Sequence, residues 1–243
     1  MSSLHEIARE LRQRLEIDRL FGWEVPVRLR RRVHGAPGAP SAGSTGAPRR
    51  GADARAEKEA RLQALRQEVA ACRACGLHRG RKQAVFGAGD PSARVLFVGE
   101  APGYDEDRLG EPFVGKAGQL LNDIIRAMGL RREDVYIANV VKCRPPGNRT
   151  PDPGEAGACR KYLEAQIEIV APEVIVALGG VAASALLGRP QPLRAVRGRF
   201  WEYRGIPLMP TYHPAYLLRY PEEKRKTWRD VQLVMARLGL ARP

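Results

Sequence analysis

The sequence lacks any apolar run approaching the ~20 residues that a membrane-spanning helix needs. Residues 1–20 also lack the unbroken apolar core of a signal peptide, because charged and apolar residues alternate there. No internal repeat is visible. With 44% hydrophobic and 28% charged residues over 243 positions, we expect a cytoplasmic globular protein, one domain of ordinary size plus some extra sequence, without membrane contact.

Acidic residues are scarce relative to basic ones. The chain has 27 Asp and Glu against 41 Lys and Arg, for a formal net charge of +14. Such an excess favours a polyanionic partner, because each phosphate neutralised by Lys or Arg releases a condensed counterion. A general bias toward arginine gives the same excess, so charge alone puts nucleic acid only modestly ahead.

The N-terminal part is poor in residues that build a core. Residues 3–20 have the apolar spacing of an amphipathic helix, and a basic run follows. The stretch after it is rich in Gly, Ala, Pro and Ser and offers almost nothing to bury. We therefore expect a helical and basic arm over 1–33, a disordered linker over 34–55 and the main domain over 56–243.

From residue 56 onward, apolar strands alternate with helical patterns. This alternation predicts an α/β fold with a mostly parallel sheet covered on both faces. Chemistry in such sheets lies beyond the carboxyl ends of the strands. We expect strands over 94–100, 135–141 and 173–180, two more over 198–214 around a turn at Arg204–Gly205, and helices over 56–72, 116–130, 155–170 and 221–239.

The loop after the first strand, GEAPGYDEDRLGEPFVGKAGQLL (99–121), is rich in glycine and carboxylates. It lacks the GxxxxGK[ST] pattern of a phosphate-binding loop and is too acidic for one. Single carboxylates in such a loop are more often helix caps than catalysts. With Glu100 and Glu106 beside Phe113, the loop suits a neutral planar ligand better than an anion.

Two further polar residues follow strands. Asn139 ends the second strand, and its amide presents one acceptor and one donor to the edge of a base. His213 follows the last strand. After it comes an apolar wedge flanked by a cation, which is what an enzyme needs to fill the stack that a flipped base leaves. The wedge comprises Tyr216, Leu217 and Leu218, and the cation is Arg219.

The four cysteines form a CxxC pair and a second, distant pair. They are Cys72, Cys75, Cys143 and Cys159. In a cytosolic chain this arrangement argues against disulfides and for a metal or cluster. The spacing does not choose between zinc and iron–sulfur.

With that cysteine arrangement, three segments resemble the family 4 uracil-DNA glycosylases, bacterial and archaeal iron–sulfur enzymes related to a phage DNA polymerase domain. The segments are GEAPGYDEDRLGEPFVGKAGQLL, VYIANVVKCRPPGNRTP and HPAYLLR. The resemblance covers about residues 60–238. It implies the uracil-DNA glycosylase fold, a parallel four-stranded sheet between helices, and a 4Fe-4S cluster on the four cysteines, with zinc as the alternative.

The resemblance also implies how the base is read. Phe113 would stack on the flipped uracil, and Asn139 would hydrogen-bond its N3–H and O4. Cytosine reverses that donor and acceptor order, so a held amide rejects it. Glu106 would sit near C5, where it disfavours the methyl group of thymine, and backbone groups around Glu100 and Ala101 would contact the base.

The implied reaction is hydrolysis of the N-glycosidic bond of flipped-out deoxyuridine, which gives free uracil and an abasic site for base excision repair. His213 would donate to O2, where negative charge develops. Well-known uracil glycosylases carry an Asp in the first motif that orients the attacking water, whereas this chain has Glu100–Ala101. Glu100 and an unassisted, dissociative route both remain open.

The implied partner is uracil-containing DNA, single- or double-stranded, bound by a monomer in the cytoplasm at the nucleoid. We expect Lys142, Arg144 and Arg219 to contact its phosphates, and the N-terminal arm to contact DNA or a replication or repair protein. One relative that binds uracil-DNA covalently uses a His in an inserted loop after the second strand. That stretch here has no His, so turnover is expected. A non-catalytic DNA-binding module with a structural metal is the remaining alternative.

Overall fold

The structure is a computed structural model that describes residues 48–241. The arm expected over 1–33 and most of the expected linker lie outside these residues. The first described helix, α2 (Pro48–Ala71), begins inside the expected linker, so the linker boundary at residue 55 was wrong. Its early turns are rich in Ala, Arg and Glu, which are strong helix formers.

The core of the domain is a six-stranded sheet in the order β1-β3-β2-β4-β6-β5. The pairs β3–β2, β2–β4 and β4–β6 are parallel, which confirms the expected four-stranded parallel sheet. The edge strands β1 and β5 add antiparallel pairs to it. The strands are β1 (Ala88–Gly89), β2 (Val95–Gly99), β3 (Tyr136–Asn139), β4 (Val174–Leu178), β5 (Trp201–Tyr203) and β6 (Ile206–Thr211).

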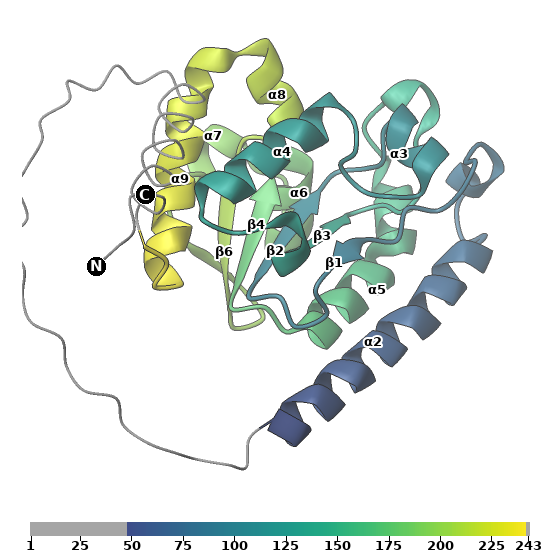
Figure 1. Ribbon diagram of the computed structural model, residues 1–243. Coiled ribbons are helices and arrows are strands. Elements are labelled where there is room, and N and C mark those ends of the chain that lie inside the picture. The colour runs from purple at the N-terminus through teal and green to yellow at the C-terminus, as the bar shows by residue number, and fades with distance from the viewer. Residues whose placement is uncertain (1–47, 242–243) are drawn as a thin grey trace, which may run out of the picture.

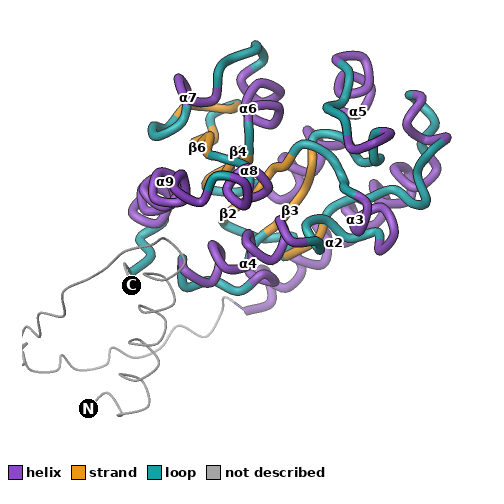
Figure 2. Tube along the Cα trace, turned by 90° about the horizontal axis from the view of Figure 1, so that it is seen from above, coloured by secondary structure: helices purple, strands orange, loops and turns teal. Residues whose placement is uncertain are grey.

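Helices cover both faces of this sheet. Residues of α2 and α5 share one buried cluster with Leu96 and Val98 of β2. Residues of α4 and α9 share the other with Val95 and Phe97, so β2 is buried on both sides. Figure 2 shows α4 and α6 on opposite sides of the strands. The remaining helices are α3 (Tyr104–Leu109), α4 (Lys116–Ala127), α5 (Pro153–Val170), α6 (Gly180–Leu187), α7 (Leu193–Val196), α8 (Pro214–Arg219) and α9 (Lys224–Arg237).

The hairpin β5–β6 turns at Arg204 and Gly205, as expected from the sequence. Both residues have positive φ, 48° and 82°. Such a turn matches the right-handed twist of the flanking strands. The hairpin brings β6 back into the parallel part of the sheet beside β4.

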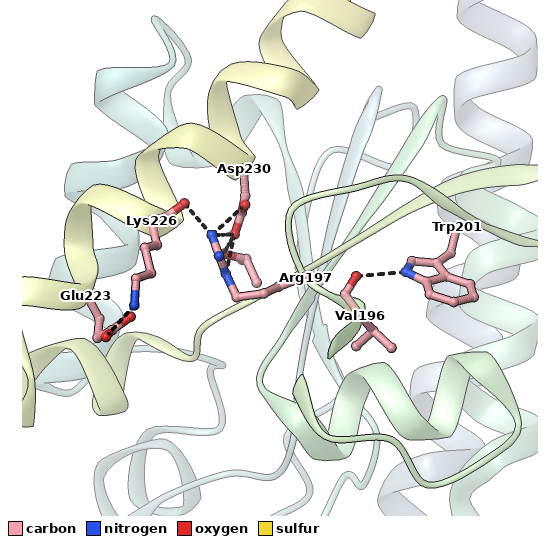
Figure 3. Close-up of polar contacts among 7 residues, drawn as sticks. Val196, Arg197, Trp201, Glu223, Lys226 and Asp230 are labelled. Atoms are coloured by element: carbon pink, nitrogen blue, oxygen red, sulfur yellow. Dashed lines mark hydrogen bonds and ion pairs between the residues drawn. The ribbon is translucent and has the colours of Figure 1, made fainter. Parts of the chain in front are cut away.

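A buried ion pair fastens the C-terminal helix α9 to the sheet. Asp230 of α9 is 1% exposed and accepts three bonds from Arg197, at 2.7, 2.8 and 3.2 Å. Figure 3 shows the Arg197 guanidinium facing this carboxylate. Asp230 also accepts a 2.6 Å bond from the hydroxyl of Thr211, the last residue of β6. The end of β6 is thereby held in place, two residues before His213.

Across residues 48–241, no helix is both long enough and apolar enough to cross a membrane.

Candidate functional site

A cavity of about 450 Å³ lies where β2 and β3 end. Figure 1 shows α3 and α8, whose preceding loops line this cavity, at the top of the domain. The cavity brings together eight residues that the sequence singled out, which are Glu100, Ala101, Glu106, Phe113, Asn139, His213, Tyr216 and Arg219. It is also lined by Pro102, Gly103, Ala117, Pro145, Asn148, Arg149 and Ala215.

The aromatic ring of the cavity belongs to Phe113, which is 5% exposed and has a φ of 55°. A left-handed conformation is unusual for an aromatic residue and indicates that its surroundings hold it there. Its ring lies 5.5 Å from the His213 ring, at an interplanar angle of 29°. Gly99 and Gly118 make room for it, since a Cβ at Gly99 would overlap the ring and one at Gly118 would overlap the carbonyl.

Two charged side chains hold the loop around Phe113. The carboxylate of Glu106 accepts bonds from the amides of Val114 and Gly115 at 2.9 and 3.0 Å, and from Gly103 at 3.1 Å. On the other side, the guanidinium of Arg132 donates to the carbonyls of Pro112 and Phe113. Both oxygens of Glu106 are thus used to shape the loop. The role of Glu106 near C5 of a base stays a prediction.

The amide of Asn139 is the polar group at the floor of the cavity. Asn139 is 2% exposed, and its Oδ1 has no hydrogen-bond partner within the part of the chain that the structure describes. An unpaired buried acceptor costs about 1–3 kcal/mol unless a ligand satisfies it. A side chain at Gly99 would overlap this oxygen too, so the absence of a Cβ there leaves room for the Asn139 amide beside the Phe113 ring.

His213 is fixed as a neutral donor. It precedes α8, and its Nδ1 accepts a 3.1 Å bond from the amide of Ala215, so the ring proton resides on Nε2. Burial and, to a smaller extent, the nearby Arg219 lower the pKa of His213 to about 4, although Glu106 partly opposes them. The imidazole is therefore neutral at pH 7.

Glu100 is the other carboxylate of the cavity. Burial raises the pKa of Glu100, and a hydrogen bond with Thr150 partly opposes that shift. The backbone here joins neighbouring strand ends, because the Glu100 carbonyl accepts a 3.1 Å bond from the amide of Val141.

The expected apolar wedge is only partly exposed. Leu217 is fully buried, at 0% exposed, and packs in the core, so its assignment as a wedge residue was wrong. The helical turn of α8 puts it on the inner face, whereas Leu218 is 45% exposed. Tyr216 lies between Tyr212 and Tyr220, with ring centroids 4.9 and 4.6 Å apart.

Lys142 does not lie on the surface, so its expected contact with DNA phosphates was wrong. It is 1% exposed. Its Nζ donates to the carbonyl of Asn139 at 2.8 Å and to Oε1 of Gln166 at 2.5 Å. Gln166 in turn donates to the carbonyl of Phe86 at 2.9 Å. This buried network holds the backbone of Asn139. Arg144, by contrast, is partly exposed, with its guanidinium 5.1 Å from the ring centroid of Tyr104.

The four cysteines line one small cavity. Cys72 and Cys75 follow α2, Cys143 follows β3, and Cys159 lies in α5. Arg81 donates to Sγ of Cys143 at 3.0 Å, and the amide of Lys142 donates to Sγ of Cys159 at 3.3 Å. Within residues 48–241, no group of three or more His, Cys, Asp or Glu side chains has the spacing of a metal-ion site. The four thiols are free and share one cavity wall.

Several supporting residues gave no signal in the sequence. Arg132 stands in the run RRED, which is typical of a solvated turn, and Gln166 lies on a helix without a motif. Asn148 and Arg149 stand in the PPGNRTP loop that the sequence did single out, but as isolated loop residues they indicated no role. Their position in the loop that follows β3 is the signal that could have pointed to Asn148 and Arg149, because ligands in α/β folds bind beyond the strand ends.

Comparisons with known proteins agree with this architecture. Residues 86–232 match the model of the uracil DNA glycosylase superfamily. The chain is 50% identical over 164 residues to the type-4 uracil-DNA glycosylase of Thermotoga maritima, covering 67% of this chain and 85% of the relative. It is 41% identical over 185 residues to the type-4 enzyme of Archaeoglobus fulgidus, covering 73% and 93%.

A DNA polymerase of Bacillus phage SP01 is also similar, at 31% identity over 153 residues, covering 63% of this chain and 16% of the polymerase. The match to the family model spans all the strands, the cavity and most of the helices described above. The chain therefore belongs to the type-4 branch of the uracil DNA glycosylase superfamily.

Proposed function

We propose that this protein is a monofunctional DNA glycosylase that hydrolyses the bond between uracil and deoxyribose, leaving free uracil and an abasic site. The observation that carries the proposal is the unpaired Oδ1 of Asn139 in a cavity that also holds Phe113 and a neutral His213. A planar base with an N–H between two carbonyls satisfies all three groups. A base inside a duplex cannot reach them, so the nucleotide must be flipped out.

Base recognition follows from the amide of Asn139. Its Oδ1 accepts N3–H of uracil, and its Nδ2 donates to O4. Cytosine presents an acceptor at N3 and a donor at C4, which leaves a buried polar group unpaired. The buried network of Lys142 and Gln166 supports this discrimination, because it fixes the backbone from which the amide projects. Phe113 supplies the stacking face.

Bond cleavage requires a donor where charge develops. As the C1′–N1 bond breaks, uracil takes up the electron pair and O2 becomes more negative. The Nε2–H of a neutral His213 stabilises that oxygen more in the transition state than in the ground state. Its low pKa suits the role, since the group acts as a hydrogen-bond donor and transfers no proton.

The attacking water is assigned to Glu100. Two carboxylates line the cavity, and both oxygens of Glu106 are already bonded to backbone amides. Glu100 is the carboxylate left to accept a proton from water at the sugar. The dissociative route, in which no side chain assists the water, is the alternative.

The four cysteines fit an iron–sulfur cluster. Such clusters are bound by four thiolates, and a cluster is larger than a single ion, so its ligands stand around a cavity. Arg81 and the amide of Lys142 already donate to two of these sulfurs, which stabilises negative charge there. The cluster would hold the end of α2, the end of β3 and α5 together. Protein purified without oxygen should contain iron and absorb broadly near ~400 nm. Stoichiometric zinc without iron would contradict the assignment.

The deciding experiment is release of free uracil from a defined oligonucleotide, single- and double-stranded, with an abasic site as the second product. The matched control is Asn139→Asp, which keeps the size of the side chain but places a second acceptor opposite O4. We expect about 10- to 100-fold slower excision by this variant. A folded wild-type protein that releases no uracil would favour the non-catalytic DNA-binding module instead.

A further inference from the structure

We infer that Tyr104, Lys82 and Arg144 form a phosphate clamp that holds the DNA backbone next to the flipped nucleotide. The inference rests on the proposed function, since it assigns a place for the strand that the glycosylase acts on. The ligand is a phosphodiester of the substrate strand. The clamp lies outside the cavity that receives the base.

The first observation is an exposed aromatic ring that gathers two cations. Tyr104 is 54% exposed, although it directly follows Gly103 of the cavity wall. The Nζ of Lys82 lies 5.7 Å from its ring centroid, and the guanidinium carbon of Arg144 lies 5.1 Å from it. A cation over an exposed ring is held only weakly. The ring therefore keeps two like charges near each other while leaving them free to bind an anion.

The second observation is the lack of carboxylate partners. Within residues 48–241, neither Lys82 nor Arg144 forms an ion pair with an acidic side chain, whereas many of the other arginines do. Arg144 bonds a neutral group, because its Nε donates to Oδ1 of Asn148 at 2.7 Å. Asp107, the buried acid of α3, accepts a bond from the backbone amide of Lys82 and not from its ammonium. Two cations thus remain available for an anion from outside.

The third observation is that three separate segments are built to meet here. The segment before β1 is tied to α3 by the bond from Lys82 N to Asp107 Oδ1 at 3.0 Å and by the bond from Gln83 Nε2 to the carbonyl of Arg108 at 2.7 Å. The loop after β3 meets α3 where the guanidinium of Arg144 lies over the Tyr104 ring, and the bond from Arg144 to Asn148 within the loop orients that guanidinium. The positions of both cations are therefore set by the fold rather than by free side-chain motion alone.

The fourth observation is continuity with the base cavity. Gly103 and Asn148 line that cavity, and each is joined directly to the clamp, Gly103 as the neighbour of Tyr104 and Asn148 through its bond to Arg144. A nucleotide whose base enters the cavity must leave its backbone at the rim. Asp105 is an exposed acid beside Tyr104, so the anion is expected at Lys82 and Arg144 and away from this carboxylate.

The test is the salt dependence of DNA binding, measured by fluorescence anisotropy with a uracil-containing single strand. We expect Lys82→Gln and Arg144→Gln each to lower the slope of log K against log salt by about 0.7, the value for one phosphate contact on a single strand. Tyr104→Phe should keep the wild-type slope, and Tyr104→Ala should lower the affinity. The matched control is Arg199→Gln, because Arg199 also lies over an aromatic ring, that of Trp201, but at the far edge strand β5.

A second arm locates the phosphate. Uncharged methylphosphonate linkages replace single phosphates on either side of the uracil. At one flanking position, this replacement should abolish the difference between wild type and Lys82→Gln. If Lys82→Gln and Arg144→Gln gave the same salt slope as Arg199→Gln, the clamp would be overturned. It would also be overturned if no single methylphosphonate linkage abolished the difference in binding between wild type and Lys82→Gln. Because binding is read without uracil release, a wild type that binds but releases nothing would overturn the proposed function and leave the clamp to be judged by its slopes.

Discussion

At the residue scale, His213 depends on its neighbours for its chemistry. The amide of Ala215 occupies Nδ1, and burial together with Arg219 lowers the pKa to about 4, from an ordinary value of 6.5. The ring is therefore neutral above about pH 5. Protonation on further acidification would put a proton on Nδ1 and break its bond from Ala215.

We expect the rate of uracil excision at saturating substrate to show no inflection near pH 6.5 that belongs to His213. His213→Ala should lower this rate about 10²- to 10³-fold, the typical effect of removing one oxyanion donor, with little change in DNA affinity. Single-turnover rates across pH 5 to 8 would check both expectations. An inflection near 6.5 in wild type that disappears in His213→Ala would contradict the neutral donor.

Glu100 gives a second prediction, because it is the carboxylate of the cavity whose oxygens are not taken by backbone amides. Glu100→Gln keeps the shape and removes the base, so excision should slow by about 10²-fold. Burial raises the pKa of Glu100, and the wild-type rate should therefore fall with acidification already above the ordinary pKa of 4.5. This acidic limb should be absent in Glu100→Gln. A variant as fast as wild type would favour the dissociative route.

The main polar and aromatic residues that line the cavity were predictable from sequence, but those that hold them in place were not. Asn139 is the last residue of an apolar strand, and Phe113 lies in the loop after another. Strand ends and the loops after them are informative positions in an α/β fold. Lys142 follows the same strand and was taken for a surface cation, because burial of an ammonium is rare in general. Only the fold reveals Gln166 and the carbonyl of Asn139 as its partners.

At the scale of elements, the end of β6 is positioned by a helix that is distant in sequence. Thr211 bonds Asp230 of α9, and Asp230 is paired with Arg197. Burial raises the pKa of Asp230, while the bonds from Thr211 and Arg197 oppose that shift. The Arg197–Asp230 pair therefore connects the end of β6, which precedes His213, to the C-terminal helix α9.

Asp230→Asn leaves a largely buried guanidinium without its counter-charge, so we expect about 3 kcal/mol lower free energy of unfolding. Urea unfolding would measure it. The control is Lys226→Ala on the same helix, which removes the exposed ion pair with Glu223 also drawn in Figure 3 and should change stability by less than about 1 kcal/mol. If both variants lowered the free energy of unfolding by the same amount, the buried pair would stabilise the fold no more than the exposed one.

The central elements were predictable because their patterns are long and apolar. β2, β3, β4 and the β5–β6 hairpin lie where the sequence indicates. β1 was missed because it has only two residues, Ala88 and Gly89, and no alternation can be read from two positions. The start of α2 was misplaced because Gly51 and Pro48 are typical of a linker, whereas the residues around them favour a helix.

At the scale of the whole molecule, the cysteine cavity joins three segments that are far apart in sequence. Figure 1 shows α2 running along the outside of α5. The core clusters hold most of the domain. If the proposed cluster joins the four thiols, it also holds the end of α2 and the loop after β3 against α5.

Cys159→Ser should therefore abolish bound iron and lower the melting temperature by roughly 10 °C, because metal-binding free energy contributes to folding. Iron analysis and thermal unfolding would measure these two effects. Removing the metal from wild type with a chelator should give the same melting temperature as the variant. A variant that keeps its iron, or that melts with wild type, would contradict the role of Cys159.

Gly99 gives the fold an evolutionary constraint. It is the last residue of β2, and a single added methyl group would overlap both the Asn139 oxygen and the Phe113 ring without disturbing a positive φ. Alanine at this position would therefore be accepted by the backbone and rejected by the cavity. The single substitution Gly99→Ala would therefore give a protein that keeps its fold and its positive charge and still binds DNA, but does not excise uracil.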